Sequence, residues 1–219
     1  GHLVWATAAG TLMAAPFDSQ KLQLTGAAFP VVENVLQNPT TGAAQYSISS
    51  TGSLIYISGG IQATQNKLVS VSRNGMEQPL AAPTHVYRAP RFSPDGQKIA
   101  VDVEEQGIQV WLYDLMRQTL TRFTFDGSAN QYPAWTPDGK RIAFESAKEG
   151  IGNMFWQLAD GSGGVERLNK GDSRQIPTSF SSAGQLLAFT EQDPTTGYDI
   201  WVLRLSDHKA QPFLQTRFT

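Results

Sequence analysis

The sequence predicts an all-β fold, a β-propeller of four-stranded antiparallel blades, and three observations support this prediction. Four glycines that end similar turns, Gly52, Gly96, Gly139 and Gly184, are separated by 44, 43 and 45 residues. A period of about 40–45 residues is typical of propellers. The 20 Gly and 12 Pro residues favour short strands and tight turns, so helices should be almost absent. Most turns also precede a run of alternating apolar residues.

The repeated turn is clearest at residues 93–96 (Ser-Pro-Asp-Gly) and 136–139 (Thr-Pro-Asp-Gly), with weaker copies at 49–52 and 181–184. Proline has the φ value that the second turn position needs, and glycine accepts the left-handed conformation of the last position. Each turn therefore predicts a hairpin between the first and second strands of a blade.

The first 38 residues predict only a partial blade. Residues 3–7 match a second strand, residues 11–15 a third strand, and residues 30–32 an outer strand. No segment precedes residue 3 that could supply the inner strand. We therefore expect four complete blades and a partial fifth within one propeller domain or fragment, residues 1–219.

The complete blades are expected at about residues 39–82, 83–126, 127–171 and 172–219. Each contains four extended runs separated by turn residues. In the first of these blades one turn is Asn74-Gly75, a strong hairpin signal. The predicted strands are 44–48, 53–57, 67–71 and 78–80; 89–92, 98–102, 108–114 and 120–123; 132–135, 141–145, 153–158 and 165–168; and 176–180, 185–189, 199–203 and 212–214.

Large apolar residues recur at equivalent positions of these blades. We interpret them as packing between neighbouring blades, because facing sheets interdigitate alternate side chains. They are Phe92, Trp135 and Phe180 on first strands, and Trp111, Phe155 or Trp156, and Trp201 on third strands.

The missing inner strand leaves two interpretations of the chain. A propeller normally protects its edges by completing one blade with strands from both ends. The chain is then either a fragment of a larger propeller or an open array that a strand from another copy completes, which would make a homo-oligomer.

Composition excludes several function classes. The net charge of −2 argues against a nucleic-acid partner, because such proteins carry clustered basic residues. The absence of cysteine excludes disulfides and thiolate metal sites. The sequence contains no run of about 18 apolar residues, so it predicts no membrane span.

Catalytic and metal sites are not predicted either, and no cofactor is expected. His2, His85 and His208 form no ligand pattern, and residues 171–175 lack the last glycine of a nucleophile elbow. Calcium is not expected, because Asp95 and Asp138 are explained by their turns. Paired carboxylates of a glycosidase are a minor alternative, and the candidates are Asp102, Glu104, Glu105, Glu145 and Glu191.

Loops that enter the inner strands converge on one mouth of the predicted channel, where side chains of different blades meet. Arginine and tyrosine there are residue types that often anchor binding partners. The candidate residues for binding a protein or a small ligand are Tyr87, Arg88, Asn130, Gln131, Arg174 and Gln175.

Residues 93–101 (Ser-Pro-Asp-Gly-Gln-Lys-Ile-Ala-Val) and 110–115 (Val-Trp-Leu-Tyr-Asp-Leu) resemble the WD-like repeat of TolB-type bacterial β-propellers, as do residues 135–144 and 198–202. Residues 12–18 and 159–162 are similar to propellers carried C-terminally by bacterial serine/threonine kinases. The resemblance implies a sensor or protein-binding domain in a periplasmic or other extracytoplasmic location. The chain has no kinase motif, so phosphoryl transfer is not implied.

These observations together predict a non-catalytic binding or sensing module of a larger bacterial protein, with its partner at the channel mouth. Two alternatives stay open. The chain could be the propeller that accompanies a prolyl-peptidase-like hydrolase, or a purely structural fragment that assembles with other copies.

Overall fold

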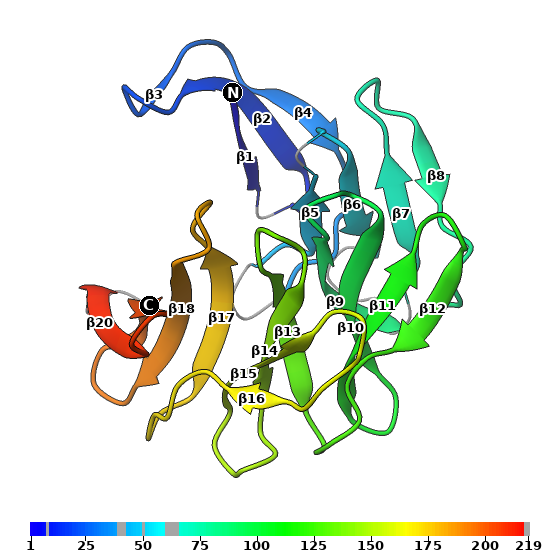
Figure 1. Cartoon of the computed structure of the whole chain (residues 1–219). Helices are drawn as coiled ribbons and strands as arrows, with labels where there is room; N and C mark the ends of the chain where they lie inside the picture. Colours follow the sequence, from blue (N-terminus) through cyan, green and yellow to red (C-terminus); the bar gives the residue numbers. More distant parts are fainter. Residues whose placement is uncertain (8, 39–42, 50, 60–65, 217–219) are drawn as a thin grey trace.

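The computed structural model describes residues 1–7, 9–38, 43–49, 51–59 and 66–216. It consists of five four-stranded antiparallel sheets placed around part of a ring (Figure 1). No described residue is helical, as predicted. Ser50, in the weakest copy of the turn, lies outside the described residues, as does the end of the chain after residue 216.

The second to fifth sheets confirm the prediction of four-stranded antiparallel blades. In each of them the strands pair in chain order, so that every neighbour in the sheet is also the neighbour in sequence. Blade 2 contains β5 (Tyr46–Ile48), β6 (Leu54–Ile57), β7 (Leu68–Val71) and β8 (Glu77–Pro79). Blade 3 contains β9 (Val86–Phe92), β10 (Lys98–Glu104), β11 (Ile108–Asp114) and β12 (Thr119–Arg122). Blade 4 contains β13 (Asn130–Trp135), β14 (Arg141–Ser146), β15 (Asn153–Leu158) and β16 (Glu166–Arg167), and blade 5 contains β17 (Gln175–Phe180), β18 (Leu186–Asp193), β19 (Gly197–Arg204) and β20 (Lys209–Leu214).

The first sheet corrects the prediction of a partial blade, because it too has four strands and completes a set of five blades. Its strands are β1 (His2–Ala6), β2 (Leu12–Asp18), β3 (Gln23–Leu24) and β4 (Phe29–Val32). The extra strand does not precede β1. Instead, β3 and β4 both pair with β2, at different points along its length. The expected single outer strand is thus split into two short ones.

The repeated turns close their hairpins with the same backbone hydrogen bond. Ser93 N donates to Lys98 O at 2.8 Å, and Thr136 N donates to Arg141 O at 3.0 Å. Asp95 accepts the Ser93 hydroxyl at 2.5 Å and the Gln97 amide at 3.0 Å, and these bonds lower the pKa of Asp95. The aspartate therefore stabilises the turn.

The turn of blade 2 is one residue shorter, since Ser49 N donates to Ser53 O instead. Because side chains alternate along a strand, this shortening makes Leu54 the counterpart of Ile99. Leu54 accordingly packs toward blade 1, as Ile99 packs toward blade 2. An alignment of the blades on their turn glycines alone therefore places the second strand of blade 2 out of register by one residue.

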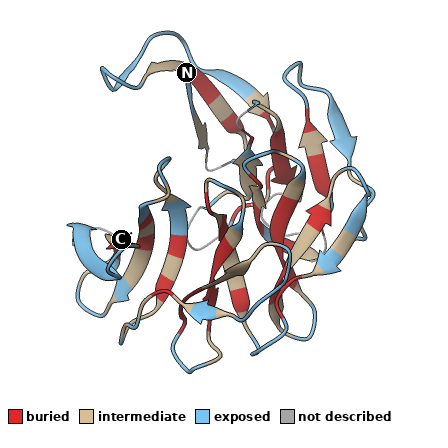
Figure 2. Cartoon of the chain, in the orientation of Figure 1, coloured by how far each residue is buried: buried red, intermediate tan, exposed pale blue. Residues whose placement is uncertain are grey.

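The core consists of four clusters, one between each pair of successive blades, and the buried residues follow the sheet faces in Figure 2. The packing role predicted for the recurring large residues is confirmed. Phe155 is buried, and the others lie at the margins of the clusters: Phe92, Trp111, Trp135, Trp156, Phe180 and Trp201.

Candidate functional site

The six predicted binding residues separate into two groups, because alternate residues of an inner strand point in opposite directions. Tyr87, Asn130 and Gln175 occupy equivalent positions and are buried. Tyr87 donates its hydroxyl to Pro83 O at 2.6 Å, and its burial raises the pKa of that hydroxyl. Asn130 donates to Gln109 Oε1 at 2.9 Å. These three residues support the blades from inside.

The other three residues, Arg88, Gln131 and Arg174, keep part of their surface accessible. Arg88 forms an ion pair with Glu104 of the neighbouring strand in the same blade. Arg174 joins two blades, because its Nε and Nη2 donate to Glu145 Oε1 and Oε2 at 2.6 and 2.9 Å. Gln131 Nε2 donates to the same carboxylate at 3.4 Å.

The bidentate contact fixes the Arg174 guanidinium. Its hydrogen bonds to Glu145 raise the pKa of Arg174 above its usual range. The guanidinium also lies over the ring of Tyr132, 5.8 Å from the ring centre. The ion pair and the ring contact together order a guanidinium that stays partly accessible.

Asp102 is buried and contacts the backbone of Tyr132. Its Oδ1 and Oδ2 accept the Tyr132 amide at 3.1 and 3.0 Å. Burial raises the pKa of Asp102 well above its ordinary value, although the Tyr132 amide and the nearby charges of Arg91 and Arg88 oppose that rise. Asp102 therefore links the Arg88 side of the site to Tyr132.

The backbone explains why these partners differ between blades. Ala89 and Tyr132 lie in bulges of the inner strands, with φ of 46° and 58°. Their amides donate across blade boundaries, that of Ala89 to Gln45 Oε1 and that of Tyr132 to Asp102. The equivalent residue of blade 5 is Pro177, which has no amide hydrogen. Glu145, the counterpart of Asp102, binds the Arg174 side chain instead.

We call the accessible part of this network the axial cluster: Arg88, Gln131, Tyr132 and Arg174. These residues come from the first strands of blades 3 and 4 and from the loop before β17. Asp102 accepts the Tyr132 amide, and Glu145 accepts the side chains of Gln131 and Arg174. In this arrangement Arg88 is exposed, and Gln131, Tyr132 and Arg174 are partly exposed.

The carboxylates considered for glycoside hydrolysis all have partners. Glu105 contacts His85 Nδ1 at 3.4 Å, and Glu191 accepts Gln175 Nε2 at 2.7 Å. Asp102, Glu104 and Glu145 are bound as described above. Each of these five carboxylates therefore has a hydrogen-bond or ion-pair partner.

His85, His208 and the loop of residues 171–175 also have structural partners. His85 packs edge-on against Tyr87, and His208 Nδ1 lies 2.7 Å from Leu168 O. Gly171 donates its amide to Asn153 Oδ1 at 2.9 Å, and the strand β17 follows the loop. Across the described residues, no group of three or more His, Asp or Glu side chains is arranged to hold a metal ion. Nor does that part of the chain contain a helix long and apolar enough to cross a bilayer.

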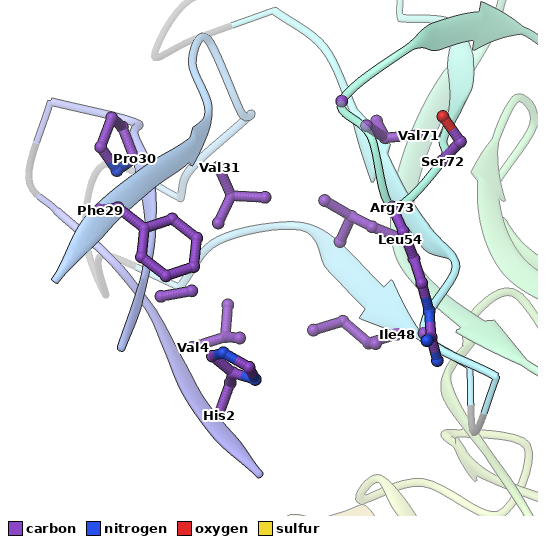
Figure 3. A pocket seen from close by; sticks show the side chains of 13 residues that line it. His2, Val4, Phe29, Pro30, Val31, Ile48, Leu54, Val71, Ser72 and Arg73 are labelled. Carbon is purple, nitrogen blue, oxygen red and sulfur yellow. The ribbon is translucent and has the colours of Figure 1, made fainter. Parts of the chain in front are cut away.

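A hollow that the sequence did not predict lies between blades 1 and 2 (Figure 3). This inter-blade cleft has a volume of about 570 Å³. Its walls include Val4, Phe29, Val31 and Leu54, with His2, Ser72 and Arg73 near them. The sequence signal is Ala14, a small residue at the position where blades 3 and 4 have Leu112 and Trp156.

Solved structures show the same fold. A putative TolB from Agrobacterium tumefaciens is 19% identical with a TM-score of 0.78, and the match covers 98% of this chain and 76% of that one. TolB from Acinetobacter baumannii is 18% identical with a TM-score of 0.69, covering 98% and 68%. An oligogalacturonate lyase from Vibrio parahaemolyticus is 14% identical with a TM-score of 0.65, covering 98% and 62%.

Identities this low show a shared fold alone. Curated protein sequences gave no match. The family comparison is more informative, because the profile described as the TolB beta propeller domain matches residues 42–218, most of the chain. The chain therefore belongs to the PD40 family of TolB β-propeller domains.

Proposed function

We propose that this propeller is a non-catalytic binding module that engages a protein partner through the axial cluster. The observation that carries the proposal is the state of Arg174, which is ordered by a bidentate ion pair and an aromatic ring while its side chain stays 31% exposed. A pre-ordered arginine loses little conformational freedom when it binds.

Three further features support a binding role over a catalytic one. Arginine and tyrosine are enriched among the residues that dominate protein interfaces. The acids nearby are held by hydrogen bonds or ion pairs, as Glu145 is by Arg174 and Gln131, and are poorly placed to exchange protons with a substrate. The cluster also extends across three blades, which suits a protein surface.

The finer parts of the proposal rest on the resemblance to kinase-linked propellers. We infer a sensing role in an extracytoplasmic location, where partner binding would be the signal. Membership of the TolB propeller family is compatible with that role, and the axial cluster is the surface that would receive the partner.

A site-specific cross-linking experiment tests the proposal. A photo-reactive amino acid at Gln131 should capture a discrete partner from an extract of the source cells, and the same group at Met116 should not. Met116 is a matched control because it is 83% exposed but lies in the turn between β11 and β12.

The captured partner is then tested with purified protein. Arg88→Ala should weaken its binding at least about tenfold, whereas Arg117→Ala, which removes an exposed arginine elsewhere in blade 3, should not. Equal capture at both positions, or equal binding by both variants, would contradict the proposal.

A further inference from the structure

The blade 2 wall of the inter-blade cleft has a small residue where the other blades have an aromatic one. Strand pairing identifies the equivalent positions, because the first strand of each of these blades pairs with the second in the same order. At the pair nearest the turn, blade 2 has Ile48, which lines the cleft. Blades 3 to 5 have larger residues at this position: Phe92, Trp135 and Phe180.

Two further small residues enlarge the same space. Val71 pairs with Leu54 on the blade 2 wall, and the equivalent residue of blade 3 is Tyr113, which is buried against blade 2. On the blade 1 wall, Ala14 replaces the larger residues of blades 3 and 4 described above. The cleft therefore follows from side-chain size within the described strands. Its volume of about 570 Å³ lies in the range of small-molecule sites.

The lining of the cleft combines apolar walls with one permanent charge. Val4, Val31 and Leu54 contribute apolar surface from both blades. The charge belongs to Arg73, in the turn between β7 and β8, and His2 is the other titratable residue of the lining. No acidic residue of the described chain lines the cleft. Such a lining favours a ligand that has an apolar body and a negative charge.

Arg73 is ordered at the edge of the cleft without an acidic partner. Its Nη2 donates to Thr51 O, and the ion pairs among the described side chains do not include it. Gly52 makes room for the guanidinium, because a Cβ on residue 52 would lie 2.5 Å from Arg73 Nε. Figure 3 shows Arg73 alongside Ile48 at the cleft wall. A guanidinium carries several N–H donors, so Arg73 keeps donors that can bind a carboxylate.

We propose that the inter-blade cleft binds a small carboxylate with an aliphatic body, of the size of a medium-chain fatty acid. The aliphatic chain lies between Ala14, Ile48 and Val71, and the carboxylate accepts hydrogen bonds from Arg73. Removal of the chain from water supplies most of the affinity, and the charge-assisted hydrogen bonds select a carboxylate over a neutral head group. The site is separate from the axial cluster, so it does not depend on the partner proposed there.

Isothermal titration calorimetry of the unaltered chain with three probes tests the chemistry of the site. Octanoate has both the chain and the charge, octanamide has the chain alone, and acetate has the charge alone. Octanoate should bind at a single site and at least about tenfold more tightly than octanamide, and acetate should give no measurable binding. No binding of octanoate, or equal affinities for octanoate and octanamide, would overturn the proposal.

Four variants test where octanoate binds. Ala14→Leu and Ile48→Phe introduce the residues of blade 3 from opposite walls, so each should weaken octanoate binding more than about tenfold by filling the cleft. Arg73→Gln should lower the affinity for octanoate to that for octanamide. Arg117→Gln is the matched control, because it removes an exposed arginine from the corresponding turn of blade 3 and should leave octanoate binding unchanged.

Urea unfolding of each variant checks that a loss of binding is not a loss of folding. The two filling variants change opposite walls, so one of them suffices if the other does not fold. Octanoate binding that survives filling of the cleft would overturn the proposal. Equal losses for Arg73→Gln and Arg117→Gln would also overturn it.

Discussion

Removal of Arg174 is expected to destabilise the propeller because it leaves a buried carboxylate behind. The Glu145 side chain is only 4% exposed, and in Arg174→Ala it would keep Gln131 Nε2 at 3.4 Å as its side-chain partner. Loss of one partner from a buried ion pair typically costs about 3–5 kcal/mol. Because 31% of the Arg174 side chain is exposed, water can reach the site, and we expect about 2–3 kcal/mol.

Arg88→Ala is the matched control, since it also removes an arginine from an ion pair of the axial cluster. The side chains of Arg88 and Glu104 are 45% and 41% exposed, so the loss should be below about 0.5 kcal/mol. The residue types alone suggest two equivalent rim arginines, and the two pairs differ most in the burial of the acid.

Urea unfolding followed by tryptophan fluorescence measures both free energies. The double variant Arg174→Ala with Glu145→Gln should be less destabilised than the sum of its single changes, with a coupling of at least about 1 kcal/mol. Equal stability of Arg174→Ala and Arg88→Ala, or additive effects in the double variant, would refute the reasoning.

Three other predictions concern stability. The pKa of Asp102 is raised in the folded state, so the folded protein binds the proton more tightly than the unfolded chain. The contribution of Asp102 to the unfolding free energy should therefore fall as the pH rises from about 3.8. The difference in unfolding free energy between the unaltered chain and Asp102→Asn, measured against pH, tests this, and an increase of that difference with pH would contradict it. Gly139→Ala should lower the unfolding free energy by about 1 kcal/mol, because residue 139 has a φ of 68°. Gly107→Ala should lower it by about 2 kcal/mol or more, because the added Cβ would lie 2.5 Å from Ser128 O. Equal losses of stability in thermal unfolding would contradict this ranking. Ala14→Val should raise the unfolding free energy by up to about 1 kcal/mol by filling the inter-blade cleft, whereas Ala143→Val in a packed boundary should lower it, and the same sign for both would count against the cleft.

The blades could be predicted from the sequence because one turn recurs and requires specific residues. A glycine such as Gly139, with φ of 68°, marks the point where the chain reverses, and the alternating runs on either side follow from it. The first blade lacks this turn, and its outer part is divided between β3 and β4, of which β3 has only two residues; the sequence therefore predicts a single outer strand there.

The candidate site could be predicted only in part. The sequence places Arg88, Gln131 and Arg174 near one another, but it does not show which residues of a strand face inward when a bulge interrupts the alternation. The bulges at Ala89 and Tyr132 decide this, and they depend on acceptors from the preceding blade. The inter-blade cleft depends on the volume of Ala14 relative to its counterparts, which no local motif encodes.

The axial cluster is above all proposed to be a binding surface. The most direct test is the affinity of the cross-linked partner, once purified, for the unaltered chain, Arg88→Ala and Arg117→Ala, measured by isothermal titration calorimetry. We predict that Arg88→Ala weakens binding at least about tenfold while Arg117→Ala leaves it unchanged. Unchanged binding by Arg88→Ala, or equal losses for both variants, would contradict the claim.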